Sequence, residues 1–340
     1  MIDPVSGFPY PEAWVRLCTD EAARDLARSG FGVLTANGTV LRRGFTTGTT
    51  AAAAAFAAVA SLAGAEVSEA EIVLPCGIPA SVPACGRNGH GEAEKFAGEY
   101  PDDITAGILI VTEAKPSEMV LLVAGEGIGR FARATPRYGL GEPAISPQAR
   151  AEILGAIAAA GCLAGVAGAE VVLRIPEGAR IGALTLNPKV GVLGGISVVG
   201  TTGFVEPWDD HLTETLGERI AAASDVVITT GRTGLRFSRL LFPACEVVLA
   251  GSKIAEALAA AEHCRSVVVC GLPGLILRFF HPEVATSRGF STVEELTASA
   301  GGPAAMRAEV LDAVRRFPRV RVVLLDRDGA VLVDSREVQG

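Results

Sequence analysis

The sequence has little positive charge, few aromatic residues and no closely paired cysteines. Its formal net charge is -8, and 5% of its 340 residues are aromatic. Nucleic acids and anionic membranes attract proteins through a positive field, so we expect neither as a general partner. The seven cysteines form no CxxC pair. A chain of this length can form a core large enough to be stable without disulfides, so we expect reduced thiols.

Metal-binding and hydrolase motifs are also missing from the sequence. The four histidines show neither HxxxH nor HxH spacing, and no cysteine lies close enough to complete a zinc site. There is no Walker GxxxxGK[ST] loop, no GxSxG elbow and no cysteine with an obvious partner base. The sequence therefore predicts no protein-bound metal. It also lacks the motifs that would indicate a nucleoside triphosphatase or a hydrolase.

Long hydrophobic runs are absent too. One long uncharged stretch, residues 153–169, is rich in Ala and Gly and is interrupted by Gly161, Gly165 and Gly168, unlike a spanning helix. Residues 1–14 hold two acidic residues and three prolines, where a signal peptide would place positive charge before an apolar run. We therefore expect a cytoplasmic protein.

The residues that are abundant favour an α/β protein of two domains. Hydrophobic residues make up 49% of the chain, and the length exceeds that of one usual domain. An alanine-rich helix is expected at residues 51–62, followed by strands near 71–74, 107–112 and 119–124. This mixture predicts an α+β N-terminal domain, which we bound loosely at residues 1–185.

From residue 190 onward, short apolar runs alternate with helical patterns. The runs lie at residues 190–193, 225–230, 245–250 and 266–270, and each is followed by glycine. This alternation predicts a Rossmann-like domain with a mainly parallel sheet over residues 186–340, which binds ligands at the carboxyl ends of its strands. Further on, Ser291 and Glu294 predict a capping-box helix start, and Asp328-Gly329 predicts a hairpin.

The segment that runs into the alanine-rich helix, residues 41–50, combines hydroxyls with two guanidinium groups. Unpaired amides at a helix N-terminus favour an anion, and arginine binds carboxylate in a bidentate manner. An ordinary threonine N-cap beside surface arginines is the alternative. The candidate substrate-binding residues are Arg42, Arg43, Thr46, Thr47 and Thr49.

A second cluster, residues 187–203, interleaves glycine and hydroxyl side chains with β-branched residues. Glycine after a strand lets backbone amides approach a nucleoside or a carboxylate, but it also occurs simply where the chain must bend. The turn after the next strand offers the same two interpretations. The candidate cofactor-binding residues are Gly194, Gly195, Ser197, Gly200, Thr201, Thr202, Gly203, Gly231 and Gly234.

Acid–base candidates come from two polar turns. Asp102 and Asp103 lie in an acidic loop, and Glu142 lies in the segment 141–147. A carboxylate within reach of a substrate proton can act as a general base. Carboxylates in such turns also occur only as solvated turn formers, so both interpretations stay open.

Residues 42–55 resemble the N-terminal signature of the cobalt-precorrin-5B C1-methyltransferase (CbiD) family, in which an Arg-Arg-Gly-aromatic-Thr-Thr-Gly segment precedes an alanine run. The family usually has cysteine where Thr50 stands. Similar segments follow in family order at residues 125–129, 141–147 and 186–203. Several motifs in one order are far more specific than a single glycine pattern.

The resemblance implies an enzyme of anaerobic cobalamin biosynthesis that methylates cobalt-precorrin-5B at ring carbon C1 to give cobalt-precorrin-6A. It implies S-adenosylmethionine as methyl donor, with cobalt arriving only as part of the corrinoid substrate. Arg42, Arg43 and the threonines would then receive the substrate's carboxylates. The loop 194–203 would receive the methionine or ribose part of the donor.

The last third departs from the family pattern. Residues 230–234 replace a Pro-Gly-Asn-Tyr-Gly-like turn, Leu275 stands at the first lysine of a Gly-Lys-Leu-x-Lys segment, and residues 285–287 lack its Thr-His-Ser. Two alternatives therefore stay open: a non-catalytic corrinoid or tetrapyrrole binding protein, and a methyltransferase acting on a different tetrapyrrole. A homo-oligomer is also an open expectation.

Overall fold

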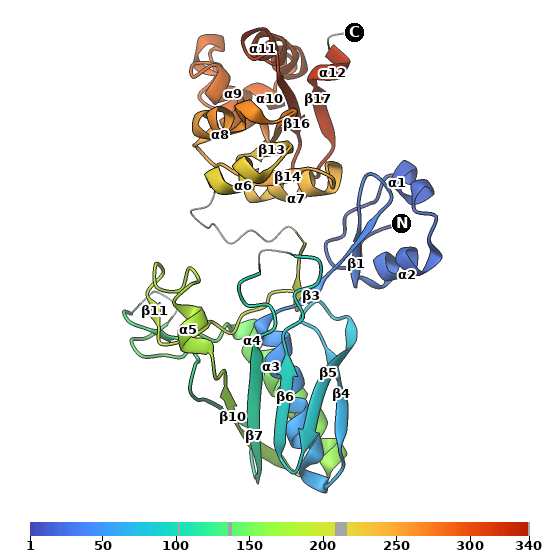
Figure 1. Cartoon of the computed structure of the whole chain (residues 1–340), viewed down its shortest axis with the longest axis vertical. Helices are drawn as coiled ribbons and strands as arrows, with labels where there is room; N and C mark the ends of the chain where they lie inside the picture. Colours follow the sequence, from blue (N-terminus) through green and yellow to red (C-terminus); the bar gives the residue numbers. More distant parts are fainter. Residues whose placement is uncertain (101–102, 135–137, 208–215, 339–340) are drawn as a thin grey trace.

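The computed structural model describes residues 1–100, 103–134, 138–207 and 216–338. It is a mixed α/β structure organised by two sheets (Figure 1). One sheet has six strands in the order β4-β5-β6-β7-β10-β8, and the other has five in the order β14-β13-β15-β16-β17. We call the part of the molecule around the first sheet the lower unit and the part around the second sheet the upper unit.

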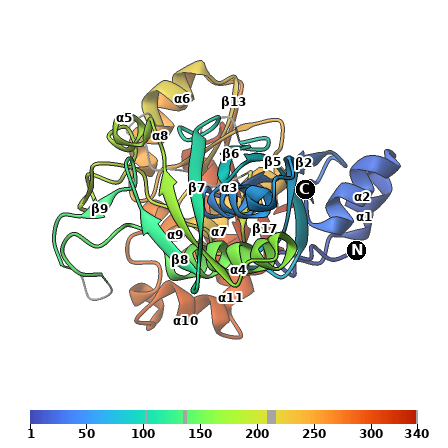
Figure 2. The same cartoon turned by 90° about the horizontal axis from the view of Figure 1, so that it is seen from below.

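The six-stranded sheet is antiparallel except where β8 runs parallel to β10. Its strands are β4 (Val67–Val73), β5 (Pro79–Arg87), β6 (His90–Glu94), β7 (Leu109–Ser117), β8 (Leu121–Ala124) and β10 (Gly168–Arg174). Burial alternates strictly along β5, so one face is covered and the other faces solvent. Helices α3 (Thr47–Ala60) and α4 (Pro147–Ala164) lie on the covered face (Figures 1 and 2).

The alanine-rich helix α3 packs unusually close to this sheet. Residues 47–59 are all buried. A Cβ on Gly86 would lie 2.2 Å from the carbonyl oxygen of Ala57, and one on Gly91 would lie 2.2 Å from that of Ala54. Small side chains on the helix and glycines on the strands therefore permit this contact. The helix begins four residues earlier than predicted, because Thr46 caps it by accepting from the Thr49 amide.

The upper unit contains the predicted parallel strands β13 (Asp225–Thr229), β14 (Glu246–Leu249) and β15 (Ser266–Gly271), with β16 (Val320–Leu325) parallel to β15 and the edge strand β17 (Val331–Asp334) antiparallel. Its helices are α6 (Leu216–Ala222), α7 (Arg232–Leu241), α8 (Ile254–Ala260), α9 (Pro273–Phe280), α10 (Val293–Ala298), α11 (Gly302–Arg316) and α12 (Ser335–Val338). The run at 190–193 does not join this sheet, contrary to the prediction. Only β11 (Val192–Leu193) forms there, and it pairs with β9 (Arg130–Phe131).

The N-terminal segment packs on the upper unit. It comprises α1 (Glu12–Leu17), α2 (Glu21–Ser29), β1 (Gly32–Leu34) and β2 (Val40–Arg42). Tyr10, Val33 and Leu34 share a buried cluster with Val227 and Phe237. Conversely, Ile196, Val198 and Phe204 belong to the core around α3. The buried clusters therefore do not divide at residue 185.

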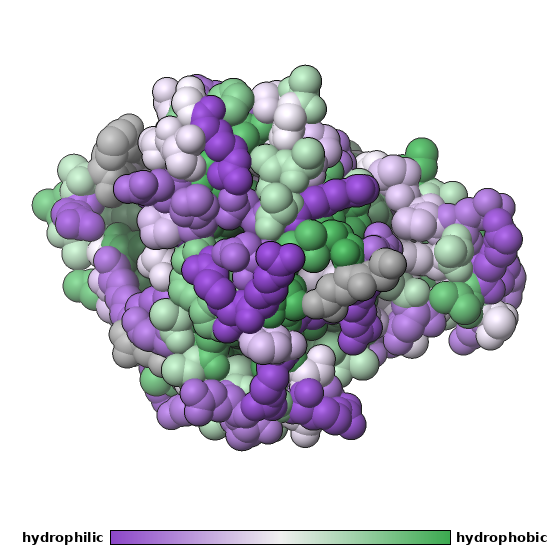
Figure 3. All heavy atoms as spheres, turned by 90° about the horizontal axis from the view of Figure 1, so that it is seen from above, coloured by the Kyte–Doolittle hydropathy of each residue, from purple (hydrophilic) through white to green (hydrophobic). Residues whose placement is uncertain are grey.

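The remaining short elements belong to neither of the two large sheets. Strand β3 (Gly44–Phe45) pairs antiparallel with β12 (Phe204–Val205), and α5 (Gly178–Gly182) precedes the glycine-rich loop. Viewed from above, the surface shows hydrophilic side chains interspersed with small hydrophobic areas (Figure 3). Within the described ranges, no helix has both the length and the hydropathy to cross a membrane. All seven cysteines are free.

Candidate active site

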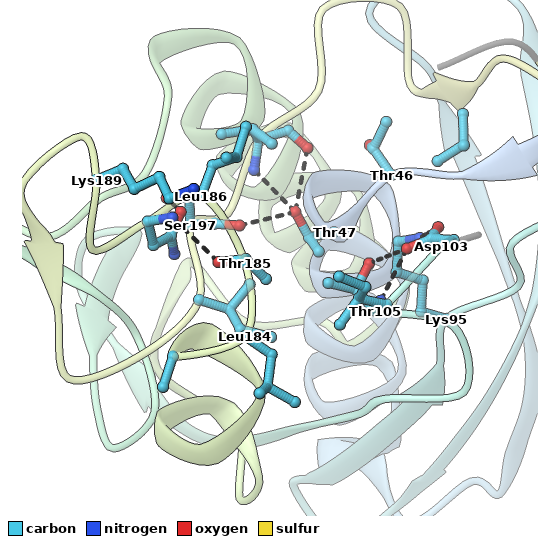
Figure 4. Close-up of a pocket in the computed structure, with 16 residues that line it drawn as sticks. Thr46, Thr47, Lys95, Asp103, Thr105, Leu184, Thr185, Leu186, Lys189 and Ser197 are labelled. Carbon is cyan, nitrogen blue, oxygen red and sulfur yellow. Dashed lines mark hydrogen bonds and ion pairs between the residues drawn. The ribbon is translucent and has the colours of Figure 1, made fainter. Parts of the chain in front are cut away.

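A cavity of about 420 Å³ lies at the N-terminal end of α3 (Figure 4). Three parts of the chain line most of it: the start of α3, Lys95 together with residues 103–105, and the segment 183–199. The polar side chains that line it are Thr46, Thr47, Lys95, Asp103, Thr105, Thr185, Asn187, Lys189 and Ser197. Cavities of this size typically hold a small organic ligand.

Threonine hydroxyls hold the glycine-rich loop against the start of α3. Thr47 Oγ1 accepts from the Val199 amide at 2.9 Å and lies within donating distance of the carbonyl oxygens of Ser197 (3.1 Å) and Val199 (3.3 Å). The Gly48 amide donates to the same Val199 carbonyl at 3.0 Å. Thr46 and Thr47 of the predicted substrate set and Ser197 of the predicted cofactor set therefore line one cavity.

Most glycines of this loop are explained by close chain packing. A Cβ on Gly195 would lie 2.2 Å from the Gly127 carbonyl oxygen, and one on Gly200 would lie 2.4 Å from Thr46 Oγ1. Gly203 has a φ of +91° beside Leu74. Gly194, with a φ of +76°, has open space around it, and only Ser197 among the predicted loop residues lines the cavity.

The hydroxyl residues of the loop differ in environment. Ser197 Oγ donates to Asn187 Oδ1 at 3.0 Å, and Asn187 Nδ2 donates to the Gly195 carbonyl at 3.0 Å. Asn187 therefore fixes the loop on the cavity side. Thr202 Oγ1 accepts from the Phe204 amide at 3.2 Å, while Thr201 is exposed. Neither Thr201 nor Thr202 lines the cavity.

A buried ion pair between Lys95 and Asp103 forms one wall, with side chains 3% and 1% exposed. Asp103 also accepts from the amide of Thr105 at 2.9 Å and from its hydroxyl at 2.5 Å. Burial alone would raise the pKa of Asp103, but Lys95 and Thr105 outweigh it and hold the pKa below its usual value. Asp103 is therefore ionised at neutral pH and a weaker base than an ordinary aspartate.

Of the other two predicted acid–base residues, the structure describes only Glu142. Asp102 lies outside the described residues. Glu142 is exposed and its Oε2 accepts from the Gly139 amide at 2.7 Å, away from the residues that line the cavity. Of the two candidates that the structure describes, Asp103 lines the cavity as the ion-pair partner of Lys95 and Glu142 does not line it.

Arg43, predicted to receive substrate carboxylates, has a fully buried side chain. It binds Asp3 in a bidentate manner at 2.7 and 3.0 Å and donates from Nε to Glu206 at 2.8 Å. Its Nη1 also donates to the carbonyl oxygens of Gly30 and Gly32. Arg42 is exposed, with its guanidinium 5.4 Å from the Phe96 ring, and does not line the cavity.

Thr49, the remaining predicted substrate residue, is fully buried behind the cavity wall. Its hydroxyl contacts Glu152 on α4 and the Gly203 carbonyl oxygen. It therefore supports the site from behind and does not line it.

Gly231 and Gly234 lie in the upper unit, after β13. A Cβ on Gly234 would lie 2.3 Å from Thr229 Oγ1, whereas Gly231 has open space around it. A separate cavity of about 450 Å³ in this unit is lined in part by Leu275, Arg278 and Thr286. The two segments that depart from the family pattern, near 275 and 286, thus lie side by side.

Sequence reasoning missed four kinds of cavity residue: the cation Lys95, the loop-fixing Asn187, the second cation Lys189 and the apolar wall formed by Leu184 and Leu186. Asn187 and Lys189 lay within the motif 186–203, but nothing in the pattern separated them from the glycines. Lys95 carried no pattern, since its partner Asp103 is set by tertiary folding.

The chain is a mixed α/β protein with a cavity of a size that suits a small molecule. A family model described as CbiD matches residues 34–207. The curated cobalt-precorrin-5B C(1)-methyltransferase of Methanoregula boonei is 52% identical over 98% of this chain and 100% of its own length. The chain therefore belongs to the CbiD family.

Other comparisons agree. The protein of the same name from Methanosarcina acetivorans is 41% identical over 99% of this chain and 99% of its own length. The crystal structure of a cobalamin biosynthesis protein (cbiD) from Archaeoglobus fulgidus matches with a TM-score of 0.56 at 35% identity. That match covers 85% of this chain and 98% of the crystallised one.

Proposed function

We propose that this enzyme methylates cobalt-precorrin-5B at C1, using S-adenosylmethionine and giving cobalt-precorrin-6A in anaerobic cobalamin biosynthesis. The observation that carries the proposal is that relatives bearing this activity in their names align over nearly the whole chain, at up to 52% identity over 98% of it. The alignment includes the divergent last third. This favours an active methyltransferase over the non-catalytic binding protein.

The cavity at the start of α3 is the proposed site where donor and acceptor meet. Its volume of about 420 Å³ suits a nucleoside-sized donor, while a whole corrinoid is too large for it and would lie across its opening. The ionised Asp103 would stabilise the positive charge of the donor. Lys95 and Lys189 would face its carboxylate, and Thr46 and Ser197 offer hydroxyls that line the same cavity.

The donor supplies an electrophilic methyl group on a sulfonium. As the sulfur–methyl bond breaks, its electron pair stays on sulfur, and the pair from ring carbon C1 forms the new bond. The protein's task is to align the two reactants and to exclude water, which accounts for large rate gains without a metal ligand set. The cavity wall fixed by Thr47 and Asn187 is suited to aligning them.

The division into two domains is also proposed here, with a boundary in the stretch after Glu206 in place of residue 185. The upper unit would be Rossmann-like, since its four parallel strands follow the order 2-1-3-4 in chain sequence. In such sheets the crevice between the first and third strands binds ligands at the carboxyl ends. Gly231 lies at that edge, with open space around it, and would contact the peripheral groups of the corrinoid.

Calorimetric titration with S-adenosylhomocysteine tests the proposed donor site. We expect saturable one-site binding, weakened about tenfold or more by Thr47→Val, because the hydroxyl that positions the loop is lost. Thr201→Val is the matched control, since Thr201 is exposed on the same loop and does not line the cavity.

Two outcomes would contradict the proposal. Equal effects of the two threonine variants would move the donor site away from this cavity. Absence of binding to the wild-type protein at millimolar ligand would favour the non-catalytic alternative. Mass analysis after incubation with cobalt-precorrin-5B and donor should give a product one methylene heavier.

A further inference from the structure

A second cavity, of about 450 Å³, lies in the upper unit, apart from the cavity at the start of α3 in the lower unit (Figure 1). We call it the α9 cavity, because Gly274, Leu275 and Arg278 of α9 line it. Their spacing places them on one face of that helix. Residues between 282 and 286 and residues 291–294 at the start of α10 form the rest of the lining. The volume suits a small organic group.

The α9 cavity lies at the carboxyl end of the parallel sheet. Only Leu272 separates the end of β15 from the start of α9. On the opposite wall, Glu294 pairs with Arg327 at 2.7 Å, and Arg327 comes two residues after the end of β16. Open α/β sheets bind their ligands outside the carboxyl ends of their strands. The position of the cavity in the fold therefore favours a ligand site over an incidental hollow.

Arg278 gives the α9 cavity a cation that the protein itself does not pair. Its side chain is exposed, and it has neither an ion pair nor a hydrogen bond within residues 1–100, 103–134, 138–207 and 216–338. The one acid among the described lining residues, Glu294, is already bound to Arg327. The lining therefore carries an unmatched positive charge in a chain whose net charge is -8. This favours an anionic ligand.

Two hydroxyls at the start of α10 can donate to the same ligand. Thr292 Oγ1 accepts from the Glu295 amide at 3.1 Å, and its proton has no acceptor in the described parts of the chain. Ser291 Oγ has no hydrogen-bond partner there either. Thr286 differs, because its hydroxyl lies 3.3 Å from the Glu283 carbonyl oxygen and donates to it. The lining thus offers one guanidinium and two hydroxyl protons.

These donors suit a carboxylate better than a phosphate. A carboxylate carries a single charge, which one guanidinium matches in a bidentate manner. A phosphate group carries a charge of about −1.5 to −2 at neutral pH and would also meet the carboxylate of Glu294. The other lining residues include four apolar ones: Leu275, Pro282, Ala285 and Val293. They suit the carbon chain of an aliphatic acid.

We propose that the α9 cavity binds the carboxylate group of an aliphatic acid, with Arg278 as its ion-pair partner and Ser291 and Thr292 as hydrogen-bond donors. Two sources present this group: a side chain of a corrinoid, and a small free carboxylic acid. Only the first source rests on the proposed function. The site itself does not, because it shares no lining residue with the cavity at the start of α3.

Calorimetric titration with two probes tests the site and identifies the source. The probes are propionate and cobyrinic acid, a stable cobalt corrinoid with free side-chain carboxylates. Arg278→Gln removes the charge and should weaken binding about tenfold or more, whereas Arg278→Lys keeps the charge and should recover part of the loss. Arg315→Gln is the matched control. Arg315 is exposed in the same unit, has no partner among the described residues and does not line the cavity.

A blocking variant tests the space independently of the charge. A Cβ on Gly274 would meet no atom within 4 Å outside its own helix. Gly274→Phe should therefore fill the cavity without straining the fold, and it should weaken whichever probe binds by at least as much as Arg278→Gln does. Gly301→Phe is the control, since Gly301 has the same open space and lies outside the cavity. If Gly274→Phe fails to fold, Arg278→Gln decides alone.

Binding of both probes through these residues would identify a small free acid as a sufficient ligand, and binding of cobyrinic acid alone would identify a corrinoid side chain. Both results support the site. It is overturned if Arg278→Gln and Gly274→Phe bind like their controls, if neither probe binds the wild type at millimolar concentration, or if phosphate displaces the probe better than propionate at equal ionic strength. S-adenosylhomocysteine affinity should be unchanged in all of these variants. Its absence in the wild type would count against the donor site and leave this one standing.

Discussion

Replacing Arg43 by alanine should destabilise the protein, in contrast to the effect expected of a substrate receptor. The change leaves two carboxylates without their shared partner: Asp3, which is 1% exposed, and Glu206, which is 15% exposed. It also removes the donors to two backbone carbonyls. Breaking a buried ion pair from one side typically costs about 3–5 kcal/mol. That is a large part of the stability of an ordinary domain, about 5–15 kcal/mol.

Urea unfolding followed by circular dichroism measures the loss, with Arg42→Ala as the matched control. Arg42 is the exposed neighbour, so its removal should change the free energy of unfolding by less than about 0.5 kcal/mol. Unchanged stability of Arg43→Ala together with weakened corrinoid binding would refute the structural role and restore the original hypothesis of a carboxylate receptor.

The effect of Arg43 should also depend on pH. Burial alone would raise the pKa of Asp3, but Arg43 outweighs it and holds the pKa below the ordinary value of 3.8. The stability from this pair is therefore fully present above that value and is lost as the pH falls through the lower, folded-state pKa. The difference between wild type and Arg43→Ala should shrink in acid, and a difference that grows there would contradict this assignment.

Three further predictions follow from buried groups. The pKa of Glu152 is raised from 4.5 to about 7, so the free energy of unfolding should fall by about 3 kcal/mol as the pH rises through that interval. Glu152→Gln should abolish this dependence when urea unfolding is measured at the lowest and the highest pH of the interval. Gly195→Ala places a Cβ 2.2 Å from the Gly127 carbonyl oxygen and should cost about 1–3 kcal/mol, seen as a lower melting temperature. Lys95→Met leaves Asp103 buried and unpaired, so it should cost about 3–5 kcal/mol and be largely rescued by adding Asp103→Leu.

Much of the upper unit could be predicted because its strands and turns are determined by residues that are close in sequence. The runs at 225–230, 245–250 and 266–270 are β-branched and apolar, and all three form strands of one sheet. Asp328-Gly329 forms the predicted hairpin, with Gly329 at a φ of +86° between β16 and β17. In each case neighbouring residues alone decide the conformation.

The capping box shows the limit of even local patterns. The sequence Ser291-Thr292-Val293-Glu294-Glu295 contains two overlapping matches, and the prediction chose the first. In the structure, Thr292 caps α10 and the Glu295 side chain accepts from its amide. The pattern could not distinguish the two registers because the position of Val293 and Leu296 in the core decides between them.

Contacts between distant segments could not be predicted. Arg43 meets Asp3 and Glu206, which lie 40 and 163 residues away, and the charge pattern around Arg43 is the same whether it faces a ligand or a buried carboxylate. Lys95 and Asp103 are only eight residues apart, yet no pattern in the sequence marks them as an ion pair. The sequence presents a cation beside a glycine-rich motif, and only the folded chain decides whether that cation is already paired.

Glycine is the clearest case of a residue whose role depends on what lies opposite it. Gly195 and Gly194 are adjacent, and a cofactor loop would explain both equally well. In the structure a Cβ on Gly195 would collide with the Gly127 backbone, whereas one on Gly194 would meet open space. Loss of ligand binding on enlarging Gly195 would therefore report a distorted loop. Enlarging Gly194 is informative only after the alanine variant is shown to fold normally. Gly194 has a φ of +76°, and a residue with a side chain in this left-handed conformation is typically strained by about 1–2 kcal/mol.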